Sequence, residues 1–64
     1  MITPDPEGYL HFSLSGRAYK LHPDRAEILL LIPRKELEQP AHWAPAALDW
    51  KQLPKYLRRE LLRY

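Results

Sequence analysis

The chain has 64 residues, with ten lysines and arginines against eight aspartates and glutamates, and a formal net charge of +2. A single domain of this length buries only about 60% of its unfolded surface, so its margin of stability is small. The absence of cysteine excludes a disulfide framework, and His11, His22 and His42 lack the spacing of a metal site. We therefore expect no metal and no cofactor, and a fold that gains stability from a homo-oligomer or a bound partner.

The sequence predicts neither a membrane-spanning segment nor a secretion signal. The longest apolar run covers residues 28–32, far short of the roughly 20 residues that cross a bilayer. The first seven residues are acidic and lack the basic and apolar regions of a signal peptide. We expect a cytoplasmic protein. Its seven prolines and its lack of asparagine are features that proteins of thermophiles share.

The N-terminal part predicts a short leader followed by a β-hairpin. Residues 1–8 contain two prolines and no periodic pattern, so we expect a flexible leader and a single domain over residues 9–64. Residues 9–14 alternate between apolar and polar side chains, which predicts a strand. Gly16 supplies the positive φ that a hairpin turn needs, and residues 18–22 form the returning strand.

The segment over residues 26–32 fits two structures. An acid in the first turn and a run of leucines favour a helix. Pro33 favours a buried strand instead, because proline disfavours the helical conformation of the residue before it. We favour the strand, since it completes a three-stranded antiparallel meander and a lone hairpin is marginal in water.

Prolines divide the C-terminal half into short pieces. We expect one helical turn over residues 34–38, an extended linker of polyproline character over residues 39–45, and a short helix over residues 46–52. A further helix that starts at Pro54 and runs to about Arg63 avoids the clash that proline causes inside a helix. The predicted fold class is α+β, an antiparallel β-hairpin or three-stranded meander with one or two short C-terminal α-helices packed on one face.

The last predicted helix has two different faces. Its apolar face suits packing against the sheet and carries Leu53, Leu57, Leu61 and Tyr64. The opposite face is basic and carries Lys55, Arg58, Arg59 and Arg63. Like-charge pairs four residues apart cost a few tenths of a kcal/mol each, so a helix adapted only for stability would alternate the sign of its charges. This basic face is either a solvated helix face, with its cations near the negative end of the helix dipole, or an anion-binding surface.

Trp43 and Trp50 are the second candidate feature. Two tryptophans in so short a chain represent a large part of its buriable area, which favours a place in the core. Tryptophan and arginine also dominate the binding energy of protein interfaces. Trp43, which lies between two prolines, and Trp50 are therefore candidate aromatic anchors for a partner.

These features predict a small non-catalytic binding protein. The sequence has no glycine-rich phosphate loop, no metal motif and no recognisable nucleophile with its base, so we expect no enzyme activity. The predicted function is that of an adaptor, inhibitor or antitoxin-like regulator that binds an acidic patch of another protein. The contact residues would be Lys55, Arg58, Arg59, Arg63, Trp43 and Trp50. The alternative is a nucleic-acid-binding regulator that uses the same helix on phosphates, although a net charge of +2 is low for such a protein.

Overall fold

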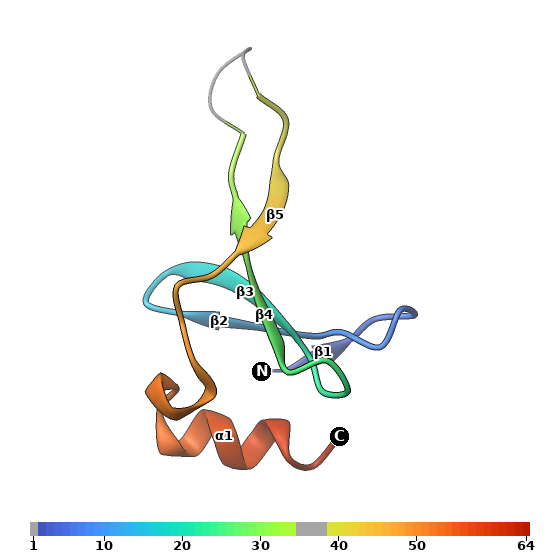
Figure 1. Ribbon diagram of the computed structural model, residues 1–64, viewed down its shortest axis with the longest axis vertical. Helices are drawn as coiled ribbons and strands as arrows, with labels where there is room; N and C mark the ends of the chain where they lie inside the picture. The colour runs from blue at the N-terminus through green and yellow to red at the C-terminus, as the bar shows by residue number, and fades with distance from the viewer. Residues whose placement is uncertain (1, 35–38) are drawn as a thin grey trace.

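The computed structural model describes residues 2–34 and 39–64, and these form a five-stranded antiparallel sheet followed by one short α-helix (Figure 1). Each strand pairs with the next one along the chain, so the sheet is a meander. The elements are β1 (Thr3–Pro4), β2 (Leu10–Leu14), β3 (Arg17–His22), β4 (Glu27–Ile32), β5 (His42–Pro45), the 3-10 turn η1 (Trp50–Gln52) and α1 (Lys55–Leu61). The α+β class is confirmed, with a wider sheet than three strands.

The central strands follow the sequence prediction. Ser15 and Gly16 have φ values of 52° and 76°, and positive φ at both central residues is what a type I′ hairpin turn requires. The turn joins β2 to β3, where Leu14 pairs with Arg17. The segment that fitted both a helix and a strand is β4, which pairs with β3 on one side and with β5 on the other.

Both edge strands were missing from the prediction, and both contain proline. The expected linker is wrong over β5, since His42 pairs with Ile32 and Pro45 pairs with Leu29. At the other edge, Pro4 of β1 pairs with Leu10. Proline is tolerated at the edge of a sheet because its missing N–H leaves no neighbouring strand without a donor.

The N-terminal residues take part in the fold from Ile2 onward. Ile2 is buried in the core, and β1 follows it. The Asp5 carboxylate then organises a turn by accepting hydrogen bonds from the backbone N–H of Glu7 at 2.8 Å and of Tyr9 at 3.0 Å. The segment expected as a leader therefore contributes a strand, a turn and a core side chain.

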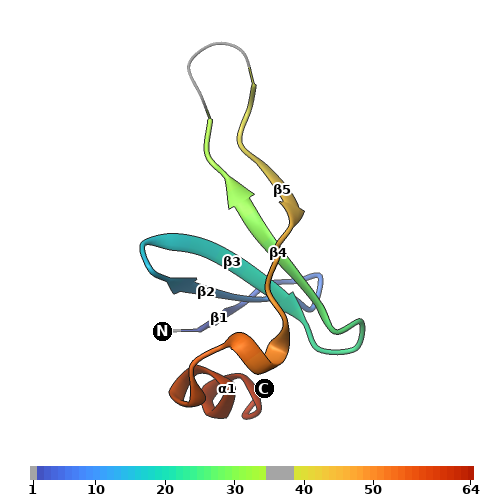
Figure 2. The same cartoon turned by 60° about the vertical axis from the view of Figure 1, so that its left-hand side comes forward.

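The core lies between one face of the sheet and the C-terminal segment. It consists of Ile2, Leu10, Phe12, Tyr19, Leu21, Ile28, Leu53, Leu57 and Leu61. Figures 1 and 2 show α1 running beneath the sheet, while β4 and β5 extend away from α1 as a long hairpin. We call the face that α1 packs against the covered face, and the opposite one the uncovered face.

The C-terminal segment contains one α-helix in the described residues rather than two. The helix expected over residues 46–52 is reduced to η1, which Asp49 caps, because its Oδ1 accepts from the N–H of Trp50 at 2.8 Å. Pro54 is the N-cap of α1, so the helix begins one residue later than predicted, at Lys55, and ends at Leu61, two residues before the predicted end. Most of the helical turn expected over residues 34–38 lies outside the described residues.

Candidate partner-binding surface

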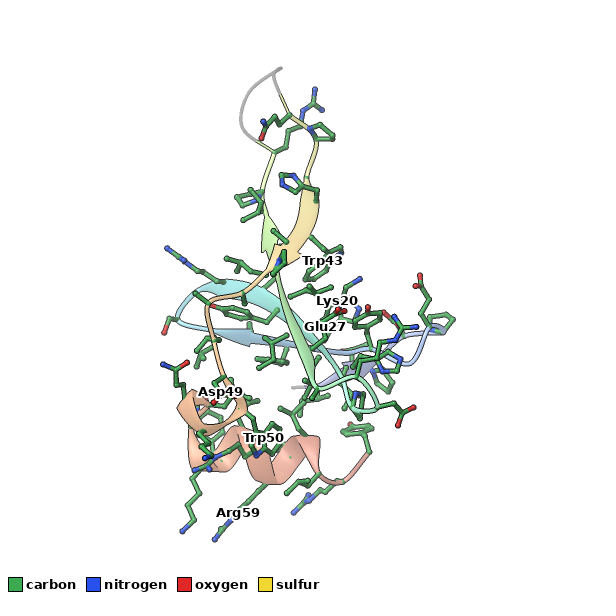
Figure 3. The ribbon with its side chains drawn as sticks, viewed as in Figure 1. Lys20, Glu27, Trp43, Asp49, Trp50 and Arg59 are labelled. Atoms are coloured by element: carbon green, nitrogen blue, oxygen red, sulfur yellow. The ribbon has the colours of Figure 1, made fainter. Side chains whose placement is uncertain are left out.

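The outer side of α1 and the turn that follows it carry three cations. Leu57 and Leu61 are buried against the sheet, which turns Lys55, Arg59 and Arg63 outward into solvent. Figure 3 shows Arg59 pointing away from the sheet. We call these three residues the basic surface.

The basic surface has little internal neutralisation. Arg63 Nη1 lies 3.6 Å from Glu60 Oε1, in an exposed pair of a kind that contributes little to stability. Lys55 and Arg59 form no ion pair with any residue that the structure describes. The positive charge on this side of the helix is therefore available to a partner.

Arg58 is set apart from the other three cations. It is half-buried, and its Nε is buried without a hydrogen-bond partner within residues 2–34 and 39–64. It stands one position before Arg59, about 100° around the helix, and one turn before Leu61 and Leu62. It therefore flanks the basic surface rather than belonging to its centre.

Large apolar side chains are exposed beside the basic surface. Tyr56 is 64% exposed, Leu62 is 74% exposed and Tyr64 is 59% exposed. Tyr64 was expected on the buried leucine face. It lies past the end of α1 instead, and its hydroxyl donates to the backbone oxygen of Ile2 at 3.3 Å. The outer side of α1 thus combines cations with apolar groups.

The two tryptophans lie on opposite faces of the sheet. Trp50 is half-buried and packs against the edge of the core, on the same side as α1. Trp43 pairs with Leu31 across β4 and β5, and side chains alternate along a strand. Because Ile28 and Leu30 face the core, Leu31 and Trp43 face the other way. The six predicted contact residues are therefore not all on one surface.

Trp43 belongs to a cluster on the uncovered face that sequence reasoning did not find. The Nζ atom of Lys20 lies 4.2 Å from the centre of the Tyr9 ring and 4.5 Å from that of Trp43, and Figure 3 shows Lys20 beside Trp43. A cation over aromatic rings is stabilised by their electron-rich faces. We call Tyr9, Lys20 and Trp43 the Lys20 cluster.

Two carboxylates border the Lys20 cluster. The Tyr9 hydroxyl donates to Glu27 Oε1 at 2.9 Å, and this hydrogen bond raises the pKa of Tyr9 above its ordinary value. His11 packs edge-on against Trp43 and lies 2.6 Å from Asp5 Oδ2 through its Nε2. The hydrogen bond from His11 lowers the pKa of Asp5. The side chains of these two pairs are thus engaged with each other, whereas the buried Nδ1 of His22 on the same face has no hydrogen-bond partner in the described residues.

Alternation along residues 9–14 was enough to place Tyr9 and His11 on one face. It could not reveal the Lys20 cluster, because the position of Trp43 follows from the pairing of β4 with β5. That pairing joins segments on either side of residues 33–41, and no periodic pattern in the sequence predicts it.

Comparison with known proteins adds no relative. No family model matches the chain, no curated protein matches it, and no solved structure matches it. Within residues 2–34 and 39–64, no group of three acidic, histidine or cysteine side chains could hold a metal ion. No helix in that part of the chain is long and apolar enough to cross a membrane. Functional inference therefore depends on the side chains of α1 and of the uncovered face.

Proposed function

We propose that this is a small non-catalytic binding protein, an adaptor, inhibitor or antitoxin-like regulator, whose basic surface docks on an acidic patch of another protein. The observation that carries the proposal is the outer side of α1, where Lys55, Arg59 and Arg63 stand beside exposed Tyr56 and Leu62. Arginine and aromatic residues are enriched in protein interfaces, where they combine contact area with polar groups.

This arrangement of side chains destabilises the free protein. Lys55 and Arg59 are a like-charge pair one turn apart, which destabilises a helix by about 0.2–0.5 kcal/mol, and Arg63 adds a third cation just past the end of α1. Leu62 contributes little hydrophobic stabilisation while it is 74% exposed. Carboxylates and apolar groups of a partner would offset both costs. The surface is therefore better suited to a complex than to the isolated fold.

Reversal of charge on the basic surface tests this function. We expect Arg59→Glu with Arg63→Glu to reduce at least tenfold the amount of partner protein that the tagged chain retains from an extract of its own organism, measured by quantitative mass spectrometry. The matched control is Arg17→Glu with Lys51→Glu, which makes the same change in charge at two other exposed positions. Circular dichroism should show both pairs folded.

Two outcomes contradict the proposal. If both charge-reversed pairs retain the same partners in the same amounts as the unchanged chain, the basic surface is only a solvated helix face. If the chain instead retains DNA or RNA in mobility-shift assays, with log affinity falling at a slope of about −3 against log salt, its three cations bind phosphates. The second outcome would establish the nucleic-acid alternative.

A further inference from the structure

An apolar pocket of about 290 Å³ lies beside the C-terminal end of α1. It is formed by the turn between β3 and β4, by η1 and by the last residues of the chain. Leu21, Ile28 and Leu61 are core residues that reach it, Trp50 lines it, and the exposed side chains of Leu62 and Tyr64 complete it. Leu62 and Tyr64 are thus at once pocket-lining residues and large apolar groups in contact with solvent.

The size of the pocket limits what it can hold. Pockets for small molecules and cofactors usually occupy about 300–1,000 Å³, so this one lies at their lower limit. Its lining is dominated by leucine, isoleucine and aromatic side chains. These properties suit one large apolar side chain of a partner, the type of anchor that fills a pocket at the centre of a protein interface.

Three arginines are close in the chain to Leu62, the outer wall of the pocket. Leu62 follows Arg58 and Arg59 by one helical turn and directly precedes Arg63. The carboxylate that lines the pocket belongs to Asp49, and its Oδ1 already accepts the N–H of Trp50 at 2.8 Å. On the side of Leu62 an occupant therefore lies near three arginines, which favours acidic residues beside its apolar anchor there, whereas the Asp49 carboxylate keeps its negative charge on the side of η1.

A second copy of the chain fits this charge distribution poorly. A symmetric pair of molecules that exchanged Leu62 would place the same surface patch against itself. Each basic surface would then face the other, and like charges opposed across an interface weaken it. The positive charge beside the pocket therefore favours a different protein as the occupant.

We propose that the pocket receives a large apolar anchor from an acidic segment of the partner protein, with carboxylates on either side of the anchor bound by Arg58, Arg59 and Arg63. The inference rests on the proposed function and deepens it, because it specifies the partner as a short segment with one apolar residue between acidic ones. Leu62 is the outer wall of the site, and Trp50 contacts the anchor.

The test is an NMR titration of the full chain with three capped pentapeptides at low salt. The first has one tryptophan between two pairs of glutamates, the second replaces the tryptophan by alanine, and the third replaces the glutamates by lysines. We expect the first to bind about tenfold more tightly than either of the others, a factor worth about 1.4 kcal/mol. Its chemical-shift changes should centre on the Trp50 indole N–H, Leu61 and Leu62.

Two variants with the same added charge separate the pocket from general electrostatics. Leu62→Glu places a negative charge on the pocket wall, and Ala47→Glu places the same charge at an exposed position outside both the pocket and the basic surface. We expect Leu62→Glu to weaken binding of the tryptophan peptide at least tenfold and Ala47→Glu to weaken it no more than about threefold, in the absence of direct contact with the anchor. Equal losses would overturn the pocket proposal.

The remaining outcomes distinguish this inference from the proposed function. If the tryptophan and alanine peptides bind equally, with shifts confined to the basic surface, the pocket proposal is overturned and the function stands. A second outcome is that no pentapeptide changes the chemical shifts of the pocket residues, while Arg59→Glu with Arg63→Glu still abolishes partner capture. The pocket proposal is then also overturned, and the proposed function stands. Shifts at Leu61 and Leu62 that grow with protein concentration alone would overturn the proposal in favour of a second copy.

Discussion

The two faces of the sheet are built from different interactions. On the covered face, leucine, isoleucine, phenylalanine and tyrosine side chains pack against α1, and no polar residue in the described part of the chain is buried there. On the uncovered face, Lys20 lies between the rings of Tyr9 and Trp43, and charged side chains border the rings. One face is stabilised by removal of apolar surface from water, and the other by contacts that depend on direction and charge.

The difference shows how a short chain supports a sheet that one helix cannot cover. The side chain of Trp43 extends from β5 across β4 to reach Lys20 on β3 and His11 on β2. It therefore ties the hairpin of β4 and β5 to the strands on the far side, in a region where Figure 2 shows no helix. A tryptophan predicted as an anchor for a partner has this internal contact in the free protein.

The largest expected effect concerns the covered face. Leu57 is 5% exposed, and replacement of a buried leucine by alanine costs about 2–5 kcal/mol through lost burial and a cavity. For a chain with so small a margin of stability, Leu57→Ala should leave much of the protein unfolded at 25 °C. Urea denaturation followed by tryptophan fluorescence measures the change. Leu62→Ala is the control on the same helix and should change the free energy of unfolding by less than about 0.5 kcal/mol.

If Leu57→Ala and Leu62→Ala gave the same free energy of unfolding, α1 would not be packed on the sheet. The covered face would then differ from the uncovered one only in composition. Packing of α1 would then no longer distinguish the covered face from the uncovered face.

A smaller loss is expected from the uncovered face. Trp43 is half-buried, so Trp43→Ala should destabilise the protein by about 2 kcal/mol, between the values for exposed and fully buried aromatic residues. Hydrogen exchange should accelerate most at the backbone N–H groups of β4 and β5. Trp43→Phe keeps a ring over Lys20 and should lose less than about 1 kcal/mol. Unchanged exchange in Trp43→Ala would mean that β5 is held by its backbone pairing alone.

The covered face could largely be predicted from the sequence, because its signals are local. Alternation placed β2, the positive φ of Gly16 placed the turn from which the chain returns as β3, and proline chemistry placed the start of α1 within one residue of Lys55. The spacing of Leu53, Leu57 and Leu61 then indicated which side of the helix meets the sheet. Each of these inferences uses residues within a few positions of one another.

The uncovered face could not be predicted in the same way. The edge strands β1 and β5 are two and four residues long, too short to show periodicity, and proline within a run argues against a strand. Without β5, nothing places Trp43 over Lys20. The pocket beside Leu62 depends likewise on the approach of the turn between β3 and β4 to the end of α1. Helical spacing grouped the exposed Lys55, Arg59 and Arg63, but it also placed the half-buried Arg58 with them.

The smallest expected effects are changes in ionisation on the uncovered face. Hydrogen bonds from His11 and from backbone N–H groups hold the pKa of Asp5 below its ordinary value, so the folded state releases this proton more readily than the unfolded state. The resulting stabilisation is present above the unfolded pKa of about 4 and is lost as the pH falls through the folded pKa. His11→Gln should raise the pKa of Asp5 toward its ordinary value, as measured by NMR titration of the carboxyl carbon.

The pKa of Tyr9, on the same face, is shifted in the opposite direction to that of Asp5. The Glu27 carboxylate raises the pKa of the Tyr9 phenol, so this stabilisation is present below the unfolded pKa of about 10 and is lost as the pH rises through the folded pKa. Glu27→Gln should lower the pKa of Tyr9. His42→Gln is the control for both residues, because His42 bonds to the backbone oxygen of Pro40 and should leave both pKa values unchanged. If the pKa of Asp5 and the pKa of Tyr9 each stayed the same in all variants, these polar contacts would not persist in solution. The uncovered face would then be stabilised by its aromatic rings alone.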